Sequence, residues 1–336
     1  GLFSPPLDLK GNSVRGIEVC KQLSRDFGLN VFTHAGTPSM ALSRIYTGAD
    51  APSRRHPGPA LRTCLKEQAH RIKYLCLHGF LGMDGVEYII RKMQDMAAET
   101  HSFILDMHQV TGISVSAARL LNQARLGFCD DDIAVVFSRT QNRPDIVEPL
   151  SKSGQQPERD RGFLSFEDND LAVEWCENRL FSAAHYAHAP ASSLAHFALF
   201  AGVPDPLLAQ VEAVTRLLEF AQGEEILVCG QEGDGRIFFV ESGTVSILVP
   251  LQNGGHQRIS SLGPGTSFGE MALLGQTGRS ASVYAETAVK CHVLDSSDIN
   301  TLSDQAPVLK ITLLENLAND MADRLRRATQ WIAALA

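Results

Sequence analysis

Residues 268–274 read FGEMALL and residues 279–283 read RSASV, and this stretch carries more structural information than any other in the chain. Gly269 lets the main chain approach a ligand closely and adopt positive φ values. The short helical turn expected after it presents free N–H groups, which favour a phosphate. Arg279 supplies a planar cationic fork for phosphate oxygens, whereas the carboxylate of Glu270 can accept hydrogen bonds from ribose hydroxyls. The stretch therefore predicts a sugar-phosphate ligand.

Two upstream segments extend the pattern, because residues 220–227 (FAQGEEIL) and 237–245 (IFFVESGTV) read as short strands with glycines at their turns. Together these segments resemble the phosphate-binding cassette and early strands of the cyclic nucleotide-binding domain family. The resemblance implies that Glu270 holds the ribose and that Arg279 holds the cyclic phosphate of a regulatory ligand, cAMP or cGMP. It also implies a cradle completed by Gly269, Met271, Ala272, Ser280 and Ala281. The alternative is a surface Glu–Arg pair beside a glycine turn, which is weak evidence by itself.

The rest of residues 195–336 fits this interpretation. A helical region over residues 197–220 is followed by many short strands with regular turns, which favours a mainly-β roll. Pro307 can begin the last helix, because its missing N–H costs little there. That helix carries an apolar stripe that is either core or a seam between subunits of a homo-oligomer: Leu313, Leu317, Met321 and Leu325. The resemblance implies that the last helix covers the purine, for which the candidates are Arg324, Arg326, Arg327 and Trp331.

Composition limits the other possibilities. A chain of 336 residues is long enough for two or three domains. Its formal net charge of −8 does not favour nucleic-acid binding, which requires a clustered basic face. No apolar run approaches the roughly 20 residues that span a bilayer. The seven cysteines are scattered without a Cys-x-x-Cys pair, so we expect neither a metal site nor disulfides, but reduced thiols in a cytoplasmic protein.

Residues 1–36 carry a different signal. A strand should end at Pro5 and Pro6, and a helix should follow the turn at Gly11. Residues 3–8 (FSPPLD) and 11–16 (GNSVRG) resemble the C-terminal end of the serine-dependent glutaminases, β-lactamase-like enzymes that hydrolyse L-glutamine to L-glutamate and ammonia. The family's catalytic Ser-x-x-Lys motif lies upstream of that end, and this sequence contains no Ser-x-x-Lys. We therefore expect a fragment of a longer bacterial protein with no catalytic residues of its own and no activity alone.

Between these regions the sequence predicts a linker, an α/β domain and a second linker. Residues 37–60 are crowded with proline, glycine and small polar residues, which is typical of a linker, and Arg54, Arg55 and His56 are interpreted as its solvated flank. Residues 61–180 alternate apolar strands with amphipathic helices, and residues 181–194 form the second linker. Residues 104–111 (ILDMHQVT) resemble the STAS family of bacterial regulators and anion transporters. Phosphorylated members carry a hydroxyl where this chain has Val115, so docking is the favoured role.

The sequence thus predicts a multidomain chain with α/β and mainly-β parts. The favoured function is the C-terminal part of a glutaminase with STAS and cyclic-nucleotide regulatory domains, whose parent takes L-glutamine. The alternative is a non-enzymatic sensor module, such as the tail of an anion transporter. Residues 3–16 favour the first, because a transporter tail has no reason to carry a glutaminase ending.

Overall fold

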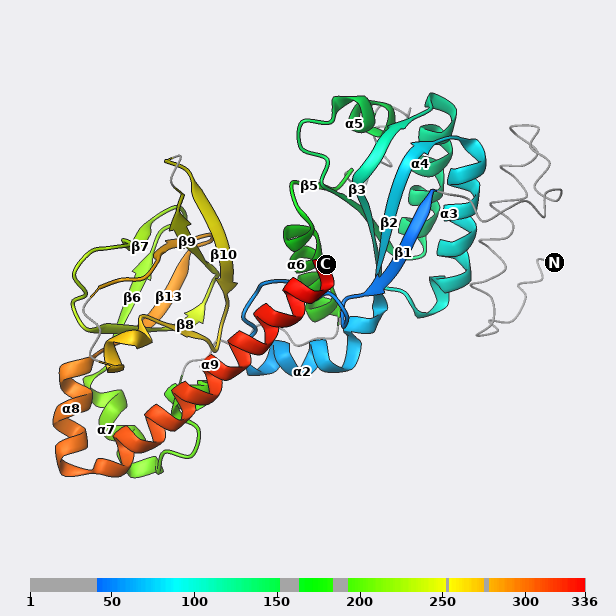
Figure 1. The fold of residues 1–336 in the computed structure, drawn as a ribbon. Helices are drawn as coiled ribbons and strands as arrows, with labels where there is room; N and C mark the ends of the chain where they lie inside the picture. The colour runs from blue at the N-terminus through cyan, green and yellow to red at the C-terminus, as the bar shows by residue number, and fades with distance from the viewer. Residues whose placement is uncertain (1–40, 152–162, 184–192, 252–253, 275–277, 336) are drawn as a thin grey trace, which may run out of the picture. The chain divides into compact units, whose positions relative to one another are not determined.

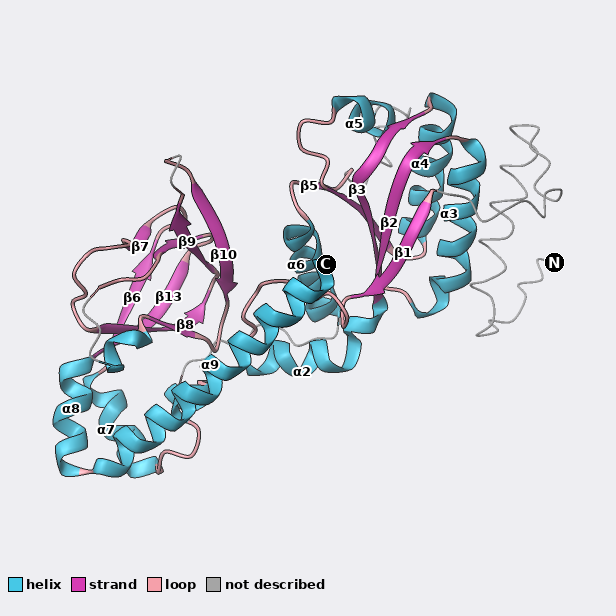
Figure 2. Ribbon diagram, in the orientation of Figure 1, coloured by secondary structure: helices cyan, strands magenta, loops and turns pink. Residues whose placement is uncertain are grey.

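The computed structural model describes residues 41–151, 163–183, 193–251, 254–274 and 278–335. These residues form two compact units, drawn in Figures 1 and 2. Unit 1 comprises the described residues up to Ser53 together with Gln68–Leu180, and unit 2 comprises Arg54–Glu67 together with the described residues from Phe181 onward. The glutaminase-like strand and helix predicted over residues 1–36 lie outside the described residues.

Unit 1 is built on a five-stranded sheet with the strand order β1-β2-β3-β4-β5. β1 is antiparallel to β2, and the other neighbours are parallel. The strands are β1 (Leu42–Thr47), β2 (Ile72–Leu81), β3 (Ser102–Ile113), β4 (Ala134–Ser138) and β5 (Ser165–Phe166). The helices are α3 (Met83–Met96), α4 (Val115–Asp130), α5 (Pro144–Ser151) and α6 (Asn169–Ala183), with 3₁₀ turns at Ala69–Arg71 and Ala97–Glu99.

The core of unit 1 lies between its sheet and three of its helices. α3 buries Val86, Ile89 and Met93, and α4 and α5 bury their apolar residues in the same cluster. The strand residues of alternate orientation, such as Ile104 and Val136, are fully buried as well, so both faces of the parallel strands are covered. The apolar runs therefore form buried strands, and the α/β alternation predicted for this region is confirmed.

Unit 2 is a roll of two four-stranded antiparallel sheets with the orders β10-β9-β12-β7 and β11-β8-β13-β6. The strands are β6 (Arg216–Phe220), β7 (Glu225–Leu227), β8 (Arg236–Ser242), β9 (Val245–Pro250), β10 (His256–Leu262), β11 (Ser267–Phe268), β12 (Ser282–Ala285) and β13 (Val289–Asp295). The helices are α2 (Pro59–Gln68), α7 (Asp205–Val214), α8 (Ser296–Gln305) and α9 (Pro307–Leu335), with 3₁₀ turns at Leu194–His196, Ala198–Phe200 and Glu270–Leu274. The predicted roll with flanking helices is confirmed.

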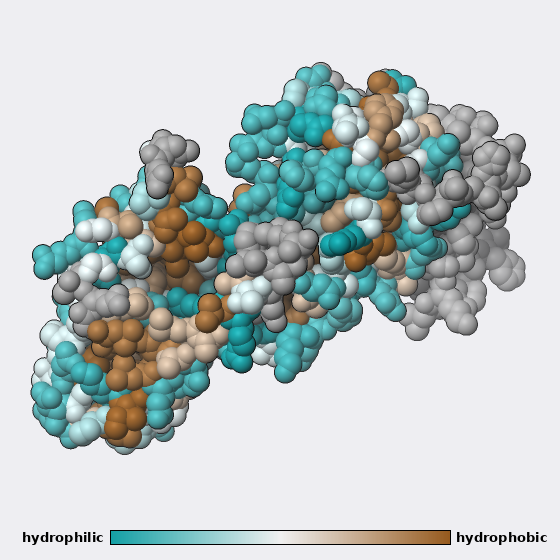
Figure 3. Space-filling model, in the orientation of Figure 1, coloured by the Kyte–Doolittle hydropathy of each residue, from teal (hydrophilic) through white to brown (hydrophobic). Residues whose placement is uncertain are grey.

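Two apolar clusters hold the roll together. Between the sheets, the rings of Phe238 and Phe268 stack with their centroids 4.8 Å apart. On the helical side, Phe197 packs edge-on against Phe239, and α9 adds buried leucines to the same cluster. Figure 3 shows the distribution of apolar and polar side chains on one face of the surface. The contacts of the α9 leucines with this second cluster fix the first half of α9 to the roll.

Three details differ from the sequence-based expectations. Residues 42–47 of the predicted linker form β1, because a β-prone run there finds the edge of β2. Residues 216–220 of the predicted helical region form β6, which pairs with the distant β13. The interpretation of Arg55 and His56 as solvated is wrong, since each is only 7% exposed.

Among the residues that the structure describes, no helix combines the length and the apolar character that a membrane span needs. The same residues include no cluster of His, Cys, Asp or Glu that could hold a metal ion.

Candidate ligand-binding site

Gly269 shapes the loop that links β11 to the 3₁₀ turn Glu270–Leu274. Its φ is +78°. A Cβ at this position would lie 2.8 Å from the carbonyl oxygen of Arg236 and 3.0 Å from Nη1 of Arg279. Glycine is therefore required both by the backbone conformation and by the space available. This agrees with the close approach of the main chain expected from the sequence.

Arg279 is almost enclosed, with 9% of its side chain exposed. Its main chain is pinned by two hydrogen bonds, from its own N–H to the carbonyl of Gln231 and from the N–H of Gly230 to its carbonyl. Its guanidinium donates to Asp234 Oδ1 at 2.7 Å and to the carbonyl oxygens of Arg236 at 3.1 Å and Gly269 at 3.4 Å. Arg279 is thus a positioned cation whose charge is paired with one carboxylate.

Asp234 is a residue of this site that the sequence interpretation missed. It accepts hydrogen bonds from Arg279 and from the N–H of Arg236, and its second oxygen lies 3.0 Å from Nε of Arg236. Burial would raise the pKa of Asp234, but the hydrogen bonds and the two guanidinium charges outweigh it, so the pKa lies below its usual value. Asp234 stands 45 positions from Arg279, and no local pattern could have joined them.

Glu270 is buried, with 7% of the residue exposed. Its Oε1 accepts a hydrogen bond of 3.2 Å from Nη1 of Arg324, which comes from α9. Arg324 also donates through Nε to Asp320 Oδ2 at 2.8 Å and through Nη2 to the carbonyl of Ser267 at 3.3 Å. Of the residues proposed on the last helix, Arg324 is therefore placed against the predicted ribose-binding carboxylate. The spacing of Asp320 and Arg324, four positions apart on one helix, was a readable signal for their pairing.

The other predicted site residues lie on the segments that flank Arg279 and Glu270. Met271 and Ala272 belong to the 3₁₀ turn, which is five residues long. Ser280 is exposed, and its carbonyl accepts a weak hydrogen bond from the thiol of Cys229 at 3.4 Å. Ala281 immediately precedes β12. The structure thus brings Arg279 into contact with Gly269, the residue before Glu270. The other predicted site residues lie next to these three in sequence.

Comparison with known proteins agrees with this geometry. Residues 217–306 match the model of the cyclic nucleotide-binding domain, and residues 1–32 match the model of glutaminase. The chain is 30% identical over 328 residues to Glutaminase 1 of Bradyrhizobium diazoefficiens, covering 97% of this chain and 52% of that protein. Over 337 residues it is 28% identical to Glutaminase 2 of the same organism, covering 100% of this chain and 53% of that protein. The chain is homologous to glutaminases and contains a cyclic nucleotide-binding domain.

The two Bradyrhizobium glutaminases are similar along nearly the whole chain, whereas other relatives are similar only to part of it. The chain spans about half the length of the two curated glutaminases. A cAMP-dependent protein kinase regulatory subunit of Debaryomyces hansenii is 42% identical over 79 residues, covering 23% of this chain and 16% of that protein. The cyclic nucleotide-binding domain coincides with the roll of unit 2 and contains both Glu270 and Arg279.

Proposed function

We propose that residues 195–336 bind a cyclic nucleotide, cAMP or cGMP, at Gly269, Glu270, Met271, Ala272, Arg279, Ser280 and Ala281. One observation carries the proposal. The guanidinium of Arg279 donates to the carbonyl of Gly269, and the next residue is the buried carboxylate Glu270. A cation for the phosphate and an acceptor for the ribose are therefore held on either side of one glycine, within a domain matched to cyclic nucleotide binding.

In this assignment the ligand replaces the partners that Arg279 and Glu270 have in the structure. The cyclic phosphate takes the hydrogen bond that Arg279 now gives to Asp234, and a ribose hydroxyl donates to Glu270 in place of Arg324. Because Arg279 and Glu270 are both largely enclosed, these contacts form away from bulk water, where charge-assisted hydrogen bonds are stronger.

The first prediction concerns Arg279→Ala. A charge-assisted hydrogen bond contributes about 1.5–3 kcal/mol, so the variant should bind cAMP or cGMP about 10- to 200-fold more weakly than the unmutated chain. Isothermal titration calorimetry on the 336-residue chain measures this. The matched control is Arg216→Ala, which removes an arginine of β6 whose side chain is 63% exposed and paired with Asp295. Absence of binding of either nucleotide to the unmutated chain contradicts the proposal.

For the whole protein, we propose a glutaminase that hydrolyses L-glutamine to L-glutamate and ammonia. The support is the glutaminase match over residues 1–32 and the similarity to two curated glutaminases along nearly the whole chain. The hydrolysis requires an activated nucleophile, and this sequence holds no Ser-x-x-Lys. We therefore assign the catalytic residues to parts of the protein outside this chain, and we assign regulation to this chain.

The remaining assignments complete this proposal. The α/β unit is a STAS-like docking domain, supported by its residues 104–111, and the protein is cytoplasmic. It forms a homo-oligomer in which the exposed apolar residues Met321 and Leu325 of α9 contact a second copy. The sensor-only alternative is less well supported, because the two Bradyrhizobium proteins that are similar along nearly all of this chain are glutaminases.

A further inference from the structure

Residues 54–67, which we call the strap, pack against the β-roll although more than a hundred residues separate them from it in sequence. β10 is an edge strand of its sheet, and the strap covers that edge. The N–H of His56 donates to the carbonyl of Ser261 at 2.9 Å, and Ser260 Oγ donates to the carbonyl of Arg54 at 2.6 Å. An unpaired strand edge is a ready template for an added segment, and the strap uses it in this way.

The contact between the strap and the roll is close enough to require two glycines. A Cβ at Gly58 would lie 2.1 Å from the carbonyl oxygen of Pro264. A Cβ at Gly265, whose φ is +82°, would lie 3.0 Å from Cδ of Pro59. A larger residue at position 58 would therefore clash with the main chain of the roll and displace the strap.

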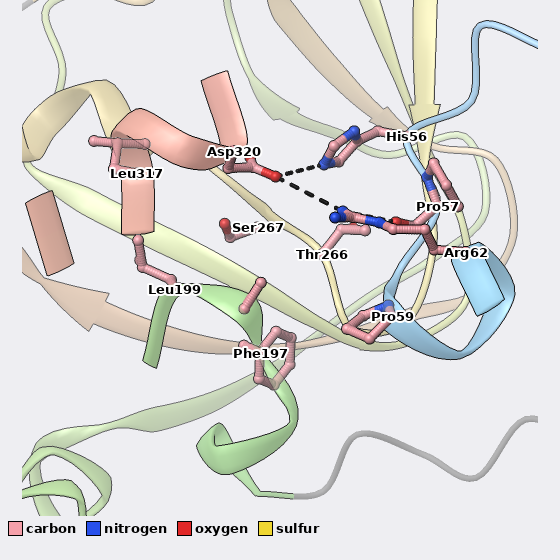
Figure 4. Close-up of a pocket in the computed structure, with 12 residues that line it drawn as sticks. His56, Pro57, Pro59, Arg62, Phe197, Leu199, Thr266, Ser267, Leu317 and Asp320 are labelled. Carbon is pink, nitrogen blue, oxygen red and sulfur yellow. Dashed lines mark hydrogen bonds and ion pairs between the residues drawn. The ribbon is translucent and has the colours of Figure 1, made fainter. Parts of the chain in front are cut away.

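The strap also contacts α9, the helix whose Arg324 binds Glu270 of the proposed nucleotide site. His56 Nε2 lies 2.9 Å from Asp320 Oδ1, and Arg62 Nη1 lies 3.3 Å from Asp323 Oδ2. Figure 4 shows His56 and Arg62 directed at Asp320. The other oxygen of Asp320 binds Arg324, and Arg324 binds Glu270. A continuous chain of polar contacts thus runs from the strap through Asp320 and Arg324 to the candidate ribose-binding carboxylate.

The charges along this chain are well defined. Burial would raise the pKa of Asp320, but the hydrogen bond from His56 and the charge of Arg324 lower it to about 2. Burial lowers the pKa of His56, and the charges of Arg324 and Arg62 lower it as well. The hydrogen bond to Asp320 offsets this lowering only in part. At neutral pH a neutral His56 therefore donates its Nε2–H to an ionised Asp320, since a carboxylate can only accept.

We propose that the strap regulates the nucleotide site: docked on β10 and α9, it holds Arg324 on Glu270 and opposes nucleotide binding, and a bound nucleotide releases the strap. The inference rests on the proposed function, because the ligand is the same cyclic nucleotide. Glu270 has 10% of its side chain exposed with Arg324 in place, so a ribose hydroxyl gains access when Arg324 withdraws. Asp320 ties Arg324 to the strap, and the two events are therefore linked in both directions.

The test compares affinities for cAMP and cGMP by calorimetry on the full 336-residue chain. His56→Ala removes the hydrogen bond to Asp320, and Gly58→Val displaces the strap sterically without touching Glu270 or Arg279. Couplings of this kind change affinity about 5- to 150-fold, and we expect both variants to bind at least about fivefold more tightly. The control is Gly82→Val, because a Cβ at Gly82 meets no atom within 4 Å.

Hydrogen exchange supplies a second readout that does not depend on a variant folding. The N–H of His56 is bonded to Ser261, and the N–H of Arg62 is bonded to Gly58. Saturating nucleotide should accelerate exchange at residues 56–62 of the unmutated chain.

The outcomes separate the two proposals. Unchanged or weakened affinity in both variants, with unchanged exchange, overturns the strap proposal, while loss of binding in Arg279→Ala still supports the nucleotide site. Binding only by the strap variants supports the strap as an inhibitor. Failure of the unmutated chain and both variants to bind either nucleotide overturns both proposals.

Discussion

Single residues of the proposed nucleotide site carry charges that are enclosed and already paired. Breaking an enclosed ion pair leaves one charge without a partner. A ligand that displaces one member of the pair must therefore supply a group that compensates the other. In the proposed complex, a cyclic phosphate would replace the carboxylate of Asp234 on Arg279 with another anion. A ribose hydroxyl is neutral and does not replace the charge of Arg324 on Glu270. In the proposed exchange, the displacement of Arg324 is therefore the more costly step, and the proposed action of the strap on α9 bears on that step.

A second residue-scale feature makes the stability of unit 1 depend on pH. His101 is 7% exposed and precedes β3. Burial and the charges of Arg179 and Arg71 lower its pKa from 6.5 to about 4. The folded state therefore resists protonation that the unfolded state accepts. Stability from this residue is present above pH 6.5 and is lost progressively as pH falls toward 4.

We expect His101→Gln to flatten this dependence. The free energy of unfolding, measured by urea titration at several pH values between 7 and about 4.5, should fall less steeply in the variant than in the unmutated chain. His108→Gln is the matched control, because His108 is an exposed residue of β3, the strand that follows His101. Parallel slopes for the unmutated chain and His101→Gln would show that burial of this imidazole does not set the dependence.

Among the elements, α9 resolves an alternative that the sequence leaves open. Its apolar stripe is core in the first half, where Leu313 and Leu317 are 0% and 2% exposed. It is exposed in the second half, where Met321 is 39% and Leu325 is 69% exposed. Core packing and availability for another surface are therefore properties of different turns of one helix.

This division predicts different effects for two leucine substitutions. Leu313→Ala should lower the free energy of unfolding of unit 2 by about 2–5 kcal/mol, because it opens a cavity in a packed cluster. Leu325→Ala should change it by less than about 0.5 kcal/mol in dilute solution, because the side chain is mostly exposed. Urea unfolding of the two variants measures both values. Equal losses would mean that the second half of α9 is buried as deeply as the first.

The elements also show how far the sequence can be interpreted. Buried strands and amphipathic helices such as β4 and α3 follow from local apolar patterns, and so does the glycine loop at Gly269. Pairings made across long separations do not follow, because nothing local encodes them. β6 gains its partner from β13, and His56 gains its partner from Asp320, 264 positions away. A proline-rich segment with arginines is typical of a linker, and only the distant edge of β10 makes it a strap.

At the scale of the whole molecule, chain connectivity gives the strap its importance. The chain leaves unit 1 after Ser53, runs through the strap and returns to unit 1 at Gln68. Ser53 is itself fixed within unit 1, since its N–H and hydroxyl donate to the buried carboxylate of Glu177 at 3.1 and 2.6 Å. The strap is thus a segment of unit 2 whose two ends continue directly into unit 1. If the strap is released as proposed, residues 54–67 are restrained only by these two connections.

The last prediction follows from this connectivity and concerns the full-length parent protein. If the parent is a glutaminase, saturating cAMP or cGMP should alter its glutamine kinetics or its oligomeric mass, because the proposed release of the strap removes its contacts with Asp320 and Asp323 of α9. A coupling of about 1–3 kcal/mol would shift such an equilibrium roughly 5- to 150-fold. Ammonia release and sedimentation, each with and without nucleotide, measure the two effects. The isolated 336-residue chain is the control and should release no ammonia above background, since it lacks a Ser-x-x-Lys motif. Identical kinetics and identical mass, with binding demonstrated in the same samples, would contradict a regulatory role for the nucleotide site in the parent.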